Sequence, residues 1–125
     1  MDQRLRKTER LTSPADFTRC YRHGKRLRTA WFIMHAYGRG ERGVRLGLAV
    51  GKAVGPAVVR NRVKRRLREI FRRHKALVPA GYDLFVRATP ASAQARYAEI
   101  EQTWREAMAV LQRGEPSSAA EHTTP

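Results

Sequence analysis

The segment from residue 57 to residue 74 constrains the fold of this chain more than any other. At 100° per residue, its apolar side chains gather on one side of a helix and its cationic side chains on the opposite side. Such a helix buries its apolar stripe against another element and presents its cationic side to solvent or to an anionic partner. The stripe consists of Val59, Val63, Leu67, Ile70 and His74, with Phe71 at its edge, and the side chains directly opposite are Asn61, Arg65, Arg68 and Arg72.

Two further helices are expected, one on each side of this segment. Ser13 and Asp16 predict a capping box at the start of a helix that stops at Gly24. The last helix is expected over residues 92–111, where apolar side chains recur at helical spacing. These side chains are Tyr97, Ile100, Trp104, Met108 and Leu111.

Strands are expected in the remaining segments. Residues 28–37 and 44–50 have the composition and alternation of strands, and we expect them to pair as a hairpin, with a short extra strand near residues 25–29. Residues 82–87 predict another strand, bounded by glycine and proline. The order α-β-β-β-α-β-α predicts an α+β protein, a two-layer sandwich in a single domain.

The composition divides the chain into three parts. We expect residues 1–12 to form a loose basic N-terminal arm and residues 13–112 to form the folded domain. Residues 113–125 are rich in small and polar residues and predict a disordered tail.

The charge of the chain indicates an anionic partner. The 26 Lys and Arg residues against 11 Asp and Glu give a net charge of +15 at pH 7. Residues 60–75 alone carry nine basic side chains and one acid, whereas ordinary surface helices mix the two signs because like charges one turn apart are destabilising. Nucleic acid is the first candidate, because arginine suits bidentate contacts with phosphate. An anionic membrane surface is the second.

Several classes of site are not expected from the sequence. The four histidines and the one cysteine, Cys20, do not occur at metal-ligand spacing, and no catalytic constellation or glycine-rich phosphate loop is present. A single cysteine excludes an intrachain disulfide and favours a cytoplasmic location. The longest apolar run, residues 46–59, contains Lys52 and is too short to span a bilayer, and no signal peptide precedes it.

Three segments, spread in order over about residues 4–110, carry a resemblance to a known family. They are Leu5-Arg6-Lys7 with Phe17, Tyr21, Gly24 and Lys25, then Leu46 to Lys52 with Val54-Gly55, and finally the Arg60-Asn61-Arg62 box that opens the basic helix. Together they resemble the protein subunit of bacterial ribonuclease P. The resemblance implies that the basic helix joins two parallel strands in a left-handed β-α-β crossover.

The resemblance also implies a function and a set of site residues. The protein would assist a catalytic RNA, which holds most of the Mg²⁺, in removing the 5′ leader of precursor tRNA; its partners would be the ribonuclease P RNA and precursor tRNA. The implied RNA-subunit contacts are Arg60, Asn61, Arg62, Lys64, Arg65, Arg68 and Arg72, and the implied leader contacts are Phe17, Tyr21 and Lys52. His35 is expected either to stack on a base or to be half-buried.

Other classes of protein share parts of this pattern. A structural RNA-binding protein, such as a small ribosomal protein, has the same charge and the same kind of helix, and processing of precursor tRNA would distinguish it. A DNA-binding regulator is disfavoured because a strand and a glycine loop, not a helix, precede residue 57. Binding of a membrane surface by the basic helix ranks last because its apolar stripe is needed for the core of so small a domain.

The outward placement of Arg65 and Arg68 on the helical wheel gives a first prediction. Replacing either with alanine should weaken association with the RNA subunit and reduce the salt dependence of binding, because each removes a phosphate contact. The fold should stay intact. Binding titrations at several salt concentrations test this expectation, and an unchanged affinity with an unchanged salt slope would contradict it.

Overall fold

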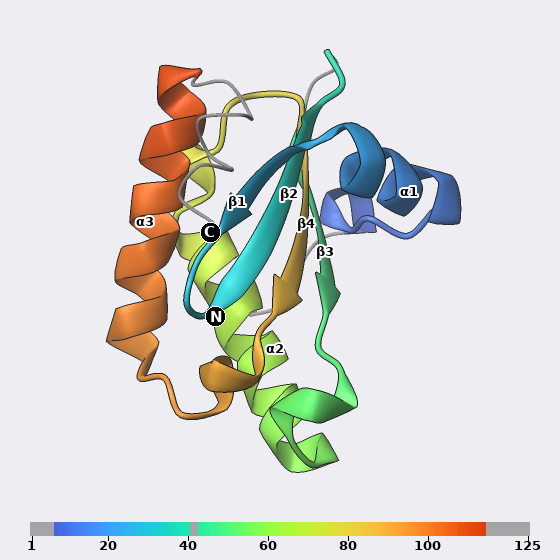
Figure 1. Ribbon diagram of the computed structural model, residues 1–125. Helices are drawn as coiled ribbons and strands as arrows, with labels where there is room; N and C mark the ends of the chain where they lie inside the picture. Colours follow the sequence, from blue (N-terminus) through green and yellow to red (C-terminus); the bar gives the residue numbers. More distant parts are fainter. Residues whose placement is uncertain (1–6, 41–42, 115–125) are drawn as a thin grey trace.

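A computed structural model of the chain describes residues 7–40 and 43–114 (Figure 1). The described residues contain three α-helices and four strands, in the expected order α-β-β-β-α-β-α. The α-helices are α1 (Pro14–His23), α2 (Ala57–Arg73) and α3 (Tyr97–Arg113), and the strands are β1 (Lys25–Arg28), β2 (Phe32–Gly38), β3 (Arg45–Ala49) and β4 (Tyr82–Ala88). Short 3-10 helices are η1 (Lys7–Glu9), η2 (Lys52–Val54), η3 (Lys75–Leu77) and η4 (Pro90–Ala93).

The four strands form one sheet in the order β1-β2-β4-β3. β2 is antiparallel to both β1 and β4, whereas β3 is parallel to β4 and is joined to it through α2. The expected hairpin between residues 28–37 and 44–50 is therefore wrong, because β4 lies between the two strands. β4 has buried residues on both of its faces, Leu84 and Val86 on one and Asp83 on the other. A strand covered on both faces belongs in the interior of a sheet.

One face of the sheet is covered by α2 and α3, and α1 lies on the opposite face (Figure 1). The buried residues of α2 are Val63, Leu67, Ile70 and Phe71, and those of α3 are Ile100, Trp104, Ala107, Met108 and Leu111. Both expected apolar stripes are thus confirmed, with Val59, His74 and Tyr97 half-buried at their margins. Trp104 lies at the centre of this core, with its ring 5.7 Å from Phe32 and 6.4 Å from Phe71.

The start of α1 differs from the expected capping box. The Ser13 side chain makes no capping hydrogen bond, and the Asp16 carboxylate pairs with Arg19 and with Arg45 of β3. A carboxylate gains more from two guanidinium groups than from one backbone N–H, which explains why the box does not form.

The part of the expected arm that the structure describes is not loose. The Leu11 N–H donates to the Leu46 carbonyl at 3.0 Å, and the Leu11 side chain is 4 % exposed. This segment pairs with the outer edge of β3 because Leu11 supplies an apolar side chain in an otherwise polar stretch. Residues 1–6 lie outside the described residues, as does the expected tail apart from Arg113 and Gly114, which end α3.

Gly47 lies in β3 beneath α1, which gives a second prediction. A β-carbon at Gly47 would lie 2.4 Å from the Phe17 ring, so Gly47→Ala must displace that ring or the helix that carries it. We expect the free energy of unfolding to fall by about 1–3 kcal/mol, the usual range for overpacking. Urea unfolding measures this change. Gly51→Ala is the matched control because nothing lies within 4 Å of a β-carbon there, and equal stability of the two variants would contradict the prediction.

Candidate nucleic-acid interface

The outer side of α2 is cationic, as its sequence predicts. Asn61 and Arg65 are exposed, and Lys64, Arg68 and Arg72 are partly exposed. These residues lie opposite the buried stripe because they occupy the other half of the helical turn. The helix therefore presents guanidinium and ammonium groups to solvent over most of its length.

Arg60, Arg62 and Arg66 of α2 donate hydrogen bonds to backbone carbonyls of the protein itself. Arg60 Nε donates to the Gly55 carbonyl at 3.0 Å. Arg62 Nη2 donates to the Ala93 carbonyl at 3.2 Å, and Arg66 Nη1 donates to the Ala95 carbonyl at 2.9 Å. These charge-assisted hydrogen bonds tie α2 to the loop before it and to the segment between β4 and α3. The resemblance predicts Arg60 and Arg62 as RNA contacts, which stays a prediction, and the structure shows that each also binds a backbone carbonyl of the protein.

A cleft of about 490 Å³ runs along the β3 edge between α1 and α2. Its apolar lining comes from Leu11, Phe17, Leu46, Gly47 and Leu48. Its cationic lining comes from Arg10, Lys64, Arg65 and Arg68, and no acidic residue is among the residues that line it. The cleft brings together Phe17, a predicted leader contact, with three predicted RNA-subunit contacts of α2.

A row of rings extends from this cleft across the α1 side of the sheet. The Phe17 ring meets Phe85 edge-on at 5.1 Å, and His35 stacks on Phe85 at 5.7 Å. Tyr21 lies 5.0 Å from His35, and the Arg87 guanidinium lies over the Tyr21 ring at 5.4 Å. Tyr21 is 56 % exposed, so part of its ring is open to a stacking partner.

Sequence reasoning missed Phe85 and Arg87 as members of this row. Their signal is the alternation of β4, because residues 85 and 87 point away from the face that Leu84 and Val86 bury. The β2–β4 register, which pairs His35 with Phe85, then brings the rings together.

His35 is the buried member of the row. It is 2 % exposed, and its Nε2 accepts a hydrogen bond from Arg87 Nε at 3.2 Å. Burial, followed by the charges of Arg87 and Arg26, lowers the pKa of His35 to about 4. The imidazole is therefore neutral near pH 7, and it packs against the Tyr21 ring.

Lys52, the third predicted leader contact, is exposed on η2. It follows the end of β3 and is not among the residues that line the cleft. Among residues 7–40 and 43–114, no group of three or more His, Cys, Asp or Glu side chains could hold a metal ion. None of the helices in this part of the chain has the length and apolar character needed to cross a bilayer.

The environment of His35 gives a third prediction. The unfolded chain titrates this residue near pH 6.5, whereas the folded pKa is about 4, so the unfolded state binds more protons between these values. The contribution of neutral His35 to the free energy of unfolding is fully present above pH 6.5. It is lost as the pH falls toward 4, which lowers the free energy of unfolding by on the order of 3 kcal/mol. Urea unfolding at pH 7, 5.5 and 4 measures the loss. His35→Gln should remove this component, and an identical pH dependence in both proteins would contradict the prediction.

Comparison with known proteins shows which family this chain is similar to. The sequence profile of the family described as Ribonuclease P matches residues 5–112. The ribonuclease P protein component of Syntrophobacter fumaroxidans is 43 % identical over 88 residues, which cover 70 % of this chain and 74 % of that protein. The component from Rhodococcus jostii is 37 % identical over 108 residues, covering 81 % and 86 %.

A solved structure extends the similarity to the fold. The Staphylococcus aureus RNase P protein superposes with a TM-score of 0.75 at 28 % identity, over 84 % of this chain and 96 % of that one. Membership of one family therefore explains the sheet order, the basic helix after a glycine loop and the matched length. The chain belongs to the ribonuclease P protein family and is the accessory protein component of that endoribonuclease.

Proposed function

We propose that α2 binds the ribonuclease P RNA through its outer side and that the cleft along the β3 edge, between α1 and α2, holds the unpaired 5′ leader of precursor tRNA. The lining of the cleft is the observation that supports the proposal, because the Phe17 ring lies in the same cleft as Lys64, Arg65 and Arg68. A strand of RNA that lay in this cleft would contact α1 and α2 at once.

The two halves of this surface suit different parts of a nucleotide. Guanidinium groups bind phosphate oxygens in pairs, so the α2 side contributes affinity that falls steeply with salt. Phe17 and the exposed ring of Tyr21 can stack on unpaired bases of any kind, which suits leaders of varied sequence. Lys52, farther along the chain, adds a phosphate contact for a longer leader.

The hydrolysis itself belongs to the RNA in this proposal. Mg²⁺ prefers carboxylate and phosphate oxygens, and the described part of the chain offers no cluster of acidic side chains for it. The protein therefore acts by holding the leader and by screening the repulsion between leader and RNA-subunit phosphates. We place this activity in the cytoplasm. RNA rather than DNA is the partner in this proposal because α2 follows a strand and the short 3-10 helix η2, not a positioning α-helix.

Cleavage of a precursor tRNA by a bacterial ribonuclease P RNA, with and without this protein at limiting Mg²⁺, tests the proposal. We expect strong stimulation with the correct mature 5′ end, because the protein replaces part of the charge screening that Mg²⁺ supplies. Tight RNA binding without stimulation would contradict the proposal and favour a structural RNA-binding protein.

The role of the cleft gives a fourth prediction. Phe17→Ala should reduce affinity of the assembled enzyme for precursor tRNA by about 5- to 150-fold, since one stacked base contributes about 1–3 kcal/mol. Affinity for mature tRNA, which has no leader, should stay the same. Equilibrium binding of both RNAs measures the difference, and an equal loss for both would argue against a leader contact.

A further inference from the structure

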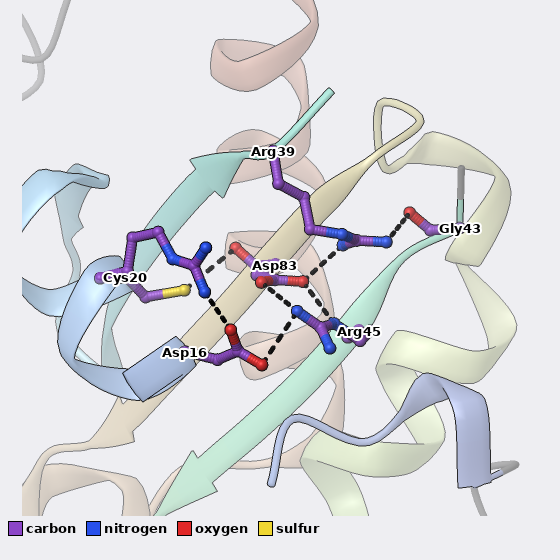
Figure 2. Close-up of polar contacts among 7 residues, drawn as sticks. Asp16, Cys20, Arg39, Gly43, Arg45 and Asp83 are labelled. Carbon is purple, nitrogen blue, oxygen red and sulfur yellow. Dashed lines mark hydrogen bonds and ion pairs between the residues drawn. The ribbon is translucent and has the colours of Figure 1, made fainter. Parts of the chain in front are cut away.

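A buried carboxylate organises the contact between the sheet and the N-terminal part of the chain (Figure 2). Asp83 of β4 is fully buried. Its Oδ1 accepts from Arg39 Nη1 at 2.5 Å and from Arg45 Nε at 2.8 Å, and its Oδ2 accepts from Arg45 Nη2 at 2.8 Å. Two arginines thus satisfy the Asp83 charge, one of them in a bidentate pair.

The same arginine continues the network to α1. Arg45 Nη2 lies 3.2 Å from Asp16 Oδ2, and the other Asp16 oxygen pairs with Arg19 (Figure 2). One helical turn later, Cys20 Sγ donates to the Asp83 backbone carbonyl at 3.8 Å. Burial raises the pKa of this thiol to about 12, so it stays protonated and can donate. Helix α1 is therefore attached to β3 and β4 at two positions four residues apart.

The side chains that attach α1 to the sheet lie next to the rings of α1. Asp16 and Cys20 form one row along the helix, and Phe17 and Tyr21 form the adjacent row, rotated by 100°. If α1 moves as a rigid body, a rotation or lift that breaks the Asp16–Arg45 contact would also shift Phe17 relative to Phe85 and Tyr21 relative to His35. The ion pair and the aromatic row are thus two consequences of one helix orientation.

Asp16 is not needed to satisfy the buried charge. Asp83 already has three hydrogen bonds from Arg39 and Arg45, whereas the Asp16–Arg45 contact joins side chains that are 15 % and 25 % exposed. What Asp16 adds is a link between the sheet and the helix that carries the rings. This separates its role from that of Arg45, whose loss would leave a buried carboxylate short of partners.

We propose that Asp16 is a positioning residue for the leader: through Arg45 and Asp83 it sets the rotation of α1, and so the placement of Phe17 and Tyr21 over the sheet. The inference rests on the proposed leader cleft. It assigns to a carboxylate a favourable effect on RNA binding, which is opposite to the effect expected from its charge.

Asp16→Asn in the assembled enzyme tests the inference. We expect affinity for precursor tRNA to fall by about three- to tenfold, because displaced contact groups lose much of their effect, with affinity for mature tRNA and for the RNA subunit unchanged. Asp16→Glu, which keeps the charge, should restore part of the loss. Glu106→Gln is the matched control, because it makes the same charge change on an exposed residue of α3, across the sheet from α1. It should not lower either affinity.

A double-mutant cycle with Phe17→Ala shows whether Asp16 acts through the ring. If it does, Asp16→Asn should cost little further affinity for precursor tRNA once Phe17 has been removed. Full additivity of the two losses, an equal loss for mature tRNA, or no loss at all would overturn the inference while leaving the leader cleft in place. Absence of any leader-specific loss in Phe17→Ala alone would instead overturn the cleft and, with it, this role of Asp16.

Discussion

Burial of β4 on both faces is the constraint on which the rest of this structure depends. Leu84 and Val86 pack under α2 and α3, and Asp83 is enclosed beneath α1. A strand with two covered faces takes an interior position, so β2 and β3 flank it and α2 must cross over from β3 to β4. That crossover presses the apolar stripe of α2 onto the sheet and turns its cationic side toward the β3 edge. The placement of this cationic surface is in this sense a consequence of where β4 lies.

The large positive charge of the chain has two structural uses. Arg39 and Arg45 neutralise a carboxylate that could not otherwise be buried, and Arg62 and Arg66 bind backbone carbonyls next to α3. Arg60 binds the Gly55 carbonyl and Arg73 contacts Tyr97 and Glu101 of α3, whereas Lys64, Arg65, Arg68 and Arg72 lie on the outer side of α2. Counting charges along the helix therefore overstates how many of them are free to bind phosphate, because a guanidinium with five donors can serve the protein and its partner on different edges.

Much of the candidate site follows from the sequence, but not all of it. The outward side of α2 depends only on helical periodicity, and the roles of Phe17 and Tyr21 came from a family resemblance carried by short motifs. Phe85 and Arg87 belong to the same aromatic row, and the alternation of β4 places them on the α1 side of the sheet without showing which rings they meet. They join it because strand register places Phe85 opposite His35, fifty residues earlier in the chain.

Local periodicity was enough to determine the elements of this protein and the side that each helix buries, because strands repeat every two residues and helices every three or four. The choice of neighbours was decided only in the tertiary structure. The hairpin expected between β2 and β3 gave way to β4, since burial of an apolar strand outweighs the short connection between the other two. The capping box expected at Asp16 gave way to Arg45 in the same manner. A carboxylate takes the strongest partner within reach, and that partner is brought near only when the sheet forms.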